Sequence, residues 1–153
     1  MPPYTYEYPR PCVTVDILLV SGSPGDYSLL LIQRKNPPFK DCWALPGGFV
    51  DIDEDLETAA CRELTEETGL FFPALRQFRA YGTVNRDPRH RTISIVFYTF
   101  TKRKKTNPVA GDDASNVQWF PLTGLPGLAF DHSNIIQDFF AFLNFEKQQT
   151  KPL

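Results

Sequence analysis

The sequence is most informative in residues 48–70, GFVDIDEDLETAACRELTEETGL. Its second half predicts a helix from about Leu56 to Thr68, because Leu56, Ala60 and Leu64 recur every four residues and form one apolar stripe. Acidic residues precede this segment, where they favour the positive end of a helix, and a glycine follows it, as at many helix ends. The predicted helix therefore packs by its stripe and presents its polar residues elsewhere.

Three glutamates of this helix, Glu63, Glu66 and Glu67, lie one turn apart on one face. Such like charges repel one another, and a purely structural helix would carry lysines among them, whereas only Arg62 is present. Clustered carboxylates suit a hard cation such as Mg²⁺ or Mn²⁺, and no His/Cys set suitable for zinc is evident. On spacing alone, a metal site and a solvated acidic face are equally good interpretations.

Charge is distributed unevenly along the chain, although the formal net charge is only −2. Residues 51–67 hold eight acids and one base, whereas residues 76–105 hold nine bases and one acid. This asymmetry fits a cation site beside an anion site, which together would hold a metal–phosphate substrate. Composition alone equally allows a solvated acidic helix and a few basic loops.

The fixed residues within 48–70 have a regular spacing. Five residues separate Gly48 from Glu54, and seven more separate Glu54 from the stretch RELTEETGL at 62–70. This resembles a complete Nudix box, G-x5-E-x7-R-E-U-x-E-E-x-G-U, where U is a bulky aliphatic residue. The resemblance implies an α/β fold, the Nudix-type α/β/α sandwich with a mixed β-sheet. It also implies hydrolysis of a nucleoside diphosphate linked to another moiety, with a divalent cation, usually Mg²⁺ and alternatively Mn²⁺.

The resemblance also implies roles for the residues of the box. The metal ligands would be Gly48, Glu63, Glu66 and Glu67, with Gly48 offering its backbone carbonyl from a loop with unusual dihedral angles. Arg62 and Glu54 would form an ion pair that orients these ligands. The catalytic base would be Glu66 or Glu67. An acid on a later loop is the other candidate, with Asp113 preferred to Asp112, although these two aspartates could simply form a turn.

Segments outside the box resemble the ADP-ribose pyrophosphatase-like branch of the family: YPRP at 8–11 before VTVD at 13–16, WALPGGFV at 43–50, RDPR at 86–89 and LAFDH at 128–132. The resemblance implies cleavage of ADP-ribose to AMP and ribose 5-phosphate. Nucleoside triphosphates, including oxidised ones, and other sugar nucleotides are alternative substrates.

A non-catalytic sensor of ADP-ribose or another nucleotide is an alternative of a different class. The same branch includes transcription regulators that carry an added DNA-binding domain and often have an eroded box. Here the box is complete, and about 8 residues follow the last predicted helix. We therefore expect a hydrolase with a small-molecule substrate and no nucleic-acid partner.

Substrate contacts would come from outside the box. Arginine binds phosphate oxygens through paired hydrogen bonds, and the candidates for phosphate or ribose contacts are Arg34, Arg86, Arg89 and Arg91, each of which could instead face solvent. Phe130, Tyr81 and Trp43 could stack on adenine, although each alone better fits a core position. Neither His90 nor His132 has a partner visible in the sequence, so no catalytic role is predicted for them.

The whole chain, residues 1–153, is predicted to form a single Nudix domain with an extended arm at 1–11 and a frayed end at 148–153. Extended segments are expected at 12–20, 27–34, 43–50, 75–84, 91–101 and 116–120, and a second helix at 132–145. Strands mixed with two helices predict an α/β layered domain.

Composition excludes several other classes of protein. With 42% hydrophobic and 22% charged residues, wholesale disorder is not expected. No apolar run approaches the ~20 residues that span a bilayer, and the N-terminus lacks the pattern of a signal peptide. Three cysteines without a CxxC pair favour a reduced, cytoplasmic protein. The family resemblance implies a homodimer.

Overall fold

The computed structural model describes residues 3–111 and 113–149. Its strands are β1 (Cys12–Ser21), β2 (Ser28–Arg34), β3 (Trp43–Ala44), β4 (Gly47–Phe49), β5 (Arg76–Tyr81), β6 (Thr92–Thr101) and β7 (Ala114–Pro121). Its helices are α1 (Leu56–Thr68) and α2 (His132–Gln149), with short 3₁₀ turns η1 (Arg103–Lys105) and η2 (Leu122–Gly124). The predicted mixture of strands and two helices is therefore present.

Strand β1 is the centre of a mixed sheet formed by these strands. It runs parallel to β6 along its whole length, from Cys12 opposite Thr92 to Ser21 opposite Thr101. It is antiparallel to β2 and β4, while β2 also pairs with β3 and β7, and β5 lies beyond β6. The mixed β-sheet expected from the family resemblance is confirmed.

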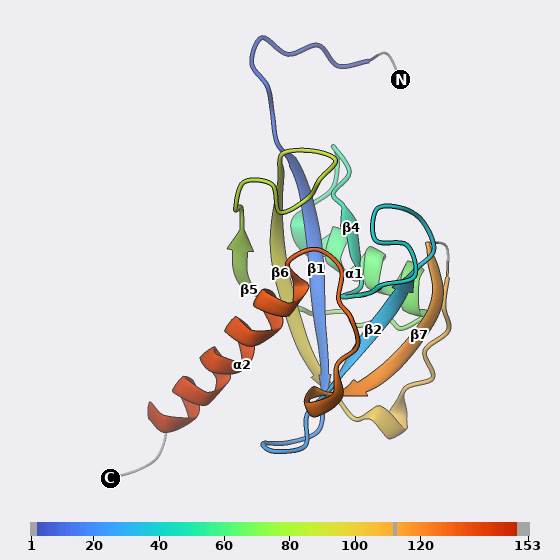
Figure 1. Cartoon of the computed structure of the whole chain (residues 1–153), viewed down its shortest axis with the longest axis vertical. Helices are drawn as coiled ribbons and strands as arrows, with labels where there is room; N and C mark the ends of the chain where they lie inside the picture. The colour runs from blue at the N-terminus through green and yellow to red at the C-terminus, as the bar shows by residue number, and fades with distance from the viewer. Residues whose placement is uncertain (1–2, 112, 150–153) are drawn as a thin grey trace.

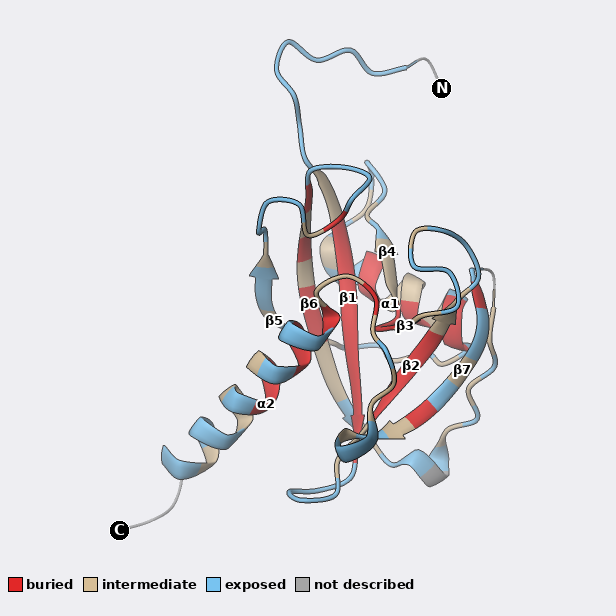
Figure 2. Ribbon diagram, viewed as in Figure 1, coloured by how far each residue is buried: buried red, intermediate tan, exposed pale blue. Residues whose placement is uncertain are grey.

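The two helices cover opposite faces of the sheet, with α2 in front and α1 behind in Figure 1. Alternate residues of β1 serve the two layers: Ile17 packs in the cluster that contains Leu64 of α1, and Leu18 packs in the cluster that contains Phe139 of α2. A strand covered on both sides must be apolar at nearly every position, and Figure 2 shows β1 buried except at its start. This explains the nearly continuous apolar run at 12–20 and confirms the α/β/α sandwich.

Element boundaries differ from the sequence expectations mainly at the ends. Helix α2 continues to Gln149 instead of stopping at Phe145, so residues 148–149, which were expected to be frayed, are helical, and residues 150–153 lie outside the described chain. Strand β5 covers only 76–81 of the expected 75–84. Strand β7 begins at Ala114, because pairing with β2 extends it beyond its apolar residues.

The N-terminal residues 3–11 form neither helix nor strand and are exposed, and they lead away from the sheet in Figure 1. Within the described ranges, no helix has the length and hydrophobicity that crossing a membrane requires.

Candidate active site

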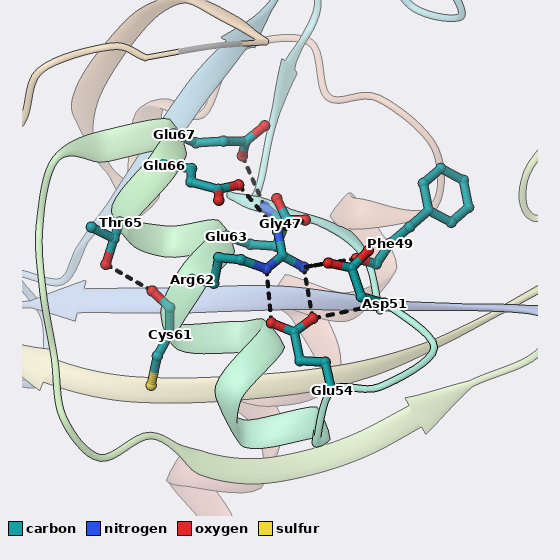
Figure 3. A network of polar contacts seen from close by, with 10 residues as sticks. All are labelled: Gly47, Phe49, Asp51, Glu54, Cys61, Arg62, Glu63, Thr65, Glu66 and Glu67. Atoms are coloured by element: carbon teal, nitrogen blue, oxygen red, sulfur yellow. Dashed lines mark hydrogen bonds and ion pairs between the residues drawn. The ribbon is translucent and has the colours of Figure 1, made fainter. Parts of the chain in front are cut away.

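Arg62 stands among the carboxylates of the α1 region (Figure 3). Its Nε and Nη2 donate to the two carboxylate oxygens of Glu54 at 2.8 Å each, which is the predicted ion pair, and Nη2 also donates to the Phe49 carbonyl at 3.1 Å. Its Nη1 donates to Glu63 at 2.8 Å and Glu66 at 3.1 Å. The hydrogen bonds from Arg62 lower the pKa of Glu54. One guanidinium thus fixes α1 against the loop that precedes it.

Glu67 points inward, in contrast to its neighbour Glu66. Its residue is 7% exposed, and its Oε2 accepts the Gly47 N–H at 2.9 Å. Burial raises the pKa of Glu67 to about 8, and the nearby charges of Glu63 and Asp113 add to the effect. Helix spacing suggested that none of the three glutamates needed to be buried. Glu67 is buried because it follows Leu64 by three residues and so lies at the edge of the apolar stripe.

Gly48 lies against the end of the Glu63 side chain, and it does not have the unusual backbone dihedral angle that the sequence suggested. It is not among the glycines with positive φ. A Cβ at this position would lie 2.4–2.6 Å from the three carboxylate atoms of Glu63. The backbone of β4 and the Glu63 carboxylate therefore face each other with no side chain between them.

The donors near α1 fit a divalent cation by their chemistry. Carboxylates and a backbone carbonyl are the ligands that Mg²⁺ and Mn²⁺ take, and the partly buried Glu63 has a raised pKa because of its burial. Within residues 3–111 and 113–149, however, no three His, Cys, Asp or Glu side chains form a ready-made metal cluster. Arg62 is hydrogen-bonded to Glu63 and Glu66, so these hydrogen bonds would have to loosen for the two carboxylates to bind a cation.

A pocket of about 170 Å³ opens beside Glu67. It is lined by glycines of β4, by acids, by arginines and by aromatic side chains from several parts of the chain. These include Thr14, Asp16, Arg34, Asn36, Gly47, Gly48, Phe49, Glu67, Arg86, Asp87, Arg89, Asp113, Phe130 and His132. Of the predicted acidic residues, Glu67 and Asp113 therefore line the same pocket as predicted arginines, whereas Glu63 and Glu66 do not line it.

Three of the four predicted arginines line this pocket, and the protein holds each of them. Arg86 donates to both carboxylate oxygens of Asp131 at 2.9 and 2.6 Å, and Arg89 to both oxygens of Asp87 at 3.0 and 2.8 Å. The Nε of Arg34 donates to a backbone carbonyl at 2.8 Å. Each guanidinium plane is thereby oriented before an anion binds.

Phe130 lies among these arginines at the same pocket. The guanidinium carbons of Arg34 and Arg89 are 4.9 and 5.7 Å from the centre of its ring. Burial lowers the pKa of Arg34, and the charge of Arg89 lowers it further. The two cations are therefore close enough to repel each other, which is an arrangement that an anion would relieve.

Other predicted contacts lie elsewhere. Arg91 does not line the pocket; its Nη1 donates to the Gly82 carbonyl at 2.7 Å, because it precedes β6 and reaches back along the connection from β5. Tyr81 donates its hydroxyl to Asp138 of α2 at 2.9 Å. Trp43 packs edge-on against Phe120. The contacts of these three residues thus stabilise the fold, and none of the three lines the pocket.

Asp113 lines the pocket, as expected of a catalytic acid from a later loop. Its Oδ1 accepts the side-chain N–H of Asn36 at 3.1 Å, and its backbone carbonyl accepts the N–H of Lys35. These bonds hold the start of β7 against the end of β2. Asp112, the less favoured alternative, lies outside the described residues.

Sequence reasoning missed a buried polar group in the lining of the pocket. Asp16 of β1 accepts the hydroxyl of Ser94 and lies 3.4 Å from Nε2 of His132 and 3.8 Å from Arg86. Burial opposes ionisation of Asp16, but His132, Ser94 and Arg86 keep its pKa below the ordinary value. The usable signal was a charged residue inside an apolar strand, which requires partners; Asp131 carried no comparable signal.

Comparison with known proteins agrees with this geometry. The family model described as "NUDIX domain" matches residues 10–139. The chain belongs to the Nudix family. It is 44% identical to an ADP-ribose pyrophosphatase of Methanocaldococcus jannaschii over 90% of this chain and 78% of that protein. It is also 37% identical to the ADPR responsive transcriptional repressor NtrR of Acinetobacter baylyi, over 94% of this chain and 59% of the repressor.

A solved structure extends the likeness to a complex. The NUDIX domain of Shewanella oneidensis NrtR, complexed with ADP ribose, superposes with a TM-score of 0.81 at 31% identity. The match covers 89% of this chain and 90% of that domain. The similar proteins thus include a pyrophosphatase, an ADPR responsive repressor and a NUDIX domain in complex with ADP ribose.

Proposed function

We propose that this protein hydrolyses ADP-ribose to AMP and ribose 5-phosphate with the help of a divalent cation, Mg²⁺ in the simplest case. The observation that carries the proposal is the meeting of two charge systems at one pocket. Glu67 of α1 and Gly48 of β4 line it together with Arg34, Arg86 and Arg89. The likeness to an ADP-ribose pyrophosphatase supports the choice of substrate.

The residues of the pocket and of α1 would have separate roles. Glu63, Glu66, Glu67 and the Gly48 carbonyl would hold the cation, and Arg62 with Glu54 would orient them. When bound, the cation neutralises the diphosphate and makes an attacking water more acidic. Arg34 and Arg89 would bind phosphate oxygens, with Phe130 beside them.

The proton of the attacking water would pass to a carboxylate that lines the pocket. Glu67 and Asp113 both do so, whereas Glu66 is exposed and hydrogen-bonded to Arg62. The geometry therefore favours Glu67 or Asp113 over Glu66 as the base. A substrate held by the arginines would bring its diphosphate, and the water that attacks it, beside these two carboxylates.

A second candidate function is an ADP-ribose-binding regulator without turnover, because the chain is also similar to an ADPR responsive repressor. The complete set of Glu63, Glu66 and Glu67 favours hydrolysis, since a binding-only domain has no need of three carboxylates clustered on one helix.

The test is a turnover assay on ADP-ribose with Mg²⁺, with AMP and ribose 5-phosphate separated and measured. Parallel reactions contain EDTA, an oxidised nucleoside triphosphate or another sugar nucleotide. The proposal predicts Mg²⁺-dependent release of both products, fastest from ADP-ribose. Tight ADP-ribose binding without turnover of any compound would establish the regulator instead, and faster cleavage of another compound would change the substrate.

A further inference from the structure

The segment that leads into α2 runs beside β3 as a short parallel ladder. The Trp43 N–H donates to the Gly127 carbonyl at 3.1 Å, and the Trp43 carbonyl accepts the Ala129 N–H at 2.8 Å. In a parallel ladder this alternation continues two residues further along. The next donor is then the Leu45 N–H, and its regular acceptor would be the Ala129 carbonyl.

Helix α2 begins here, and its first turn uses the Ala129 carbonyl as an acceptor. The Ala129 carbonyl accepts the backbone N–H of His132 at 3.2 Å, as the first turn forms. The Leu45 N–H donates instead to Nδ1 of the His132 side chain at 3.0 Å. His132 is 3% exposed, so water cannot replace this bond. The Nδ1 atom of His132 thus replaces the backbone carbonyl that would accept the Leu45 N–H in a regular ladder.

The ring is also held from its far side. Because Nδ1 accepts a hydrogen bond, the ring proton is on Nε2, which lies 3.4 Å from Oδ1 of Asp16. Asp16 is itself opposite Gly47 in the pairing of β1 with β4. The histidine therefore joins the start of α2, the centre of the sheet and the end of β3.

The bond to Leu45 matters because the next two residues lead directly to the proposed cation site. Pro46 has no N–H, and the Gly47 N–H two residues after Leu45 is the group that binds Oε2 of Glu67. We infer that His132 is a positioning residue: by fixing Leu45 it places the Gly47 N–H and, through it, the Glu67 carboxylate. This inference rests on the proposed function, which assigns Glu67 to the cation site.

Two substitutions of similar size distinguish the contact of Nδ1 with Leu45 from the contact of Nε2 with Asp16. In His132→Asn the amide oxygen can take the place of Nδ1 and accept the Leu45 N–H, but the contact with Asp16 is lost. In His132→Gln the amide reaches the Nε2 position and Asp16, but Leu45 loses its acceptor. The probe is Mn²⁺ alone, titrated into the protein and followed by electron paramagnetic resonance.

We expect His132→Gln to weaken Mn²⁺ binding by about tenfold or more, as other substitutions behind metal ligands do, and His132→Asn to weaken it much less. Thermal melts should show similar losses of stability for both variants, which separates the effect from general damage. Unchanged Mn²⁺ binding in His132→Gln, or a larger loss in His132→Asn, would overturn the inference.

Hydrogen exchange in the wild-type protein gives a second measurement, should either variant fail to fold. The Leu45 amide should exchange as slowly as neighbouring amides of β1, whereas fast exchange would contradict the bond to His132.

The proposed function and the positioning role of His132 can fail separately. A wild-type protein that binds Mn²⁺ and ranks the variants as expected, yet leaves ADP-ribose intact, would refute only the proposed function. Active protein whose His132→Gln variant binds Mn²⁺ normally would refute only the inference, and a wild type that binds no Mn²⁺ would refute both.

Discussion

The acidic and the basic side of the pocket are built in opposite ways. The acidic side is the glutamate cluster of one helix, where Glu63, Glu66 and Glu67 lie within five residues and Glu67 reaches the pocket. The basic side comes from distant segments: Arg34 ends β2, while Arg86 and Arg89 lie between β5 and β6. A helix brings its residues together by its own period, whereas the basic side exists only after the whole sheet has formed.

The two sides also differ in how their charges are balanced. On the basic side, Arg86 and Arg89 each have a carboxylate partner with two hydrogen bonds. On the acidic side, burial raises the pKa of Glu67 to about 8, and its one described side-chain hydrogen bond is to a neutral backbone N–H. Arg62 supplies positive charge to Glu63 and Glu66, whereas Glu67 has no described hydrogen bond to a cation and would gain positive charge from a bound ion. The basic side is preorganised.

The largest effect is expected from Glu67→Gln. It removes a charge from the proposed cation site while keeping the shape of the side chain, so kcat for ADP-ribose should fall by about a hundred- to a thousandfold. Steady-state kinetics with saturating Mg²⁺ measure the change. Glu57→Gln, at an exposed site in the first turn of the same helix, is the matched control and should retain full activity. Normal turnover in Glu67→Gln would remove it from the site.

The next effect concerns stability. Arg86→Met should lower the free energy of unfolding by about 3–5 kcal/mol, because it leaves the buried Asp16 and the carboxylate of Asp131 without their cation. Urea denaturation followed by circular dichroism measures it. Arg91→Met is the control and should stay within about 0.5 kcal/mol, because the described hydrogen bonds of its guanidinium go to exposed backbone carbonyls. An equal loss of unfolding free energy in the two variants would refute the claim that Arg86, unlike Arg91, neutralises buried carboxylates.

A pH dependence is expected of the metal-free protein. Because the pKa of Glu67 is raised in the folded state from 4.5 to about 8, the folded protein holds a proton there that the unfolded chain has lost. Its contribution to stability is present below about pH 4.5 and is lost as the pH rises towards 8, by a few kcal/mol in total.

Thermal melts in EDTA between pH 5 and 8.5 test this, with Glu67→Gln as the reference. The melting temperature of the wild type should fall relative to that of the variant as the pH rises, and Mg²⁺ should reduce the fall. Parallel curves for the two proteins would mean that Glu67 keeps an ordinary pKa.

The smallest effect is expected from Arg89→Ala. Its guanidinium lines the pocket and would bind phosphate under the proposed function, so the KM for ADP-ribose should rise by about tenfold with a smaller change in kcat. Arg91→Ala, away from the pocket, should leave both unchanged. A KM that does not move in Arg89→Ala would remove Arg89 from substrate binding.

Prediction from the sequence succeeded for features formed by nearby residues and failed for features that depend on distant segments. The bounds of α1 and the pair of Arg62 with Glu54 depend on contacts within a few turns, and both agree with the structure. The burial of Glu67 and the displacement of Arg91 depend on which neighbours the sheet supplies. His132 shows this most clearly, since its partner Leu45 is 87 residues away in the chain. No local pattern contains that information.

The most direct test of the account is a crystal structure with Mn²⁺ and ADP-ribose, using a slow variant such as Glu67→Gln alongside the wild type. The anomalous signal of Mn²⁺ should lie beside Glu63, Glu66 and Gly48, with the diphosphate between the ion and Arg34 and Arg89. In the variant this signal should be weaker. Mn²⁺ bound only by the exposed loop at residues 51–55, or ADP-ribose bound away from the arginines, would contradict the central claim that one pocket joins the two charge systems.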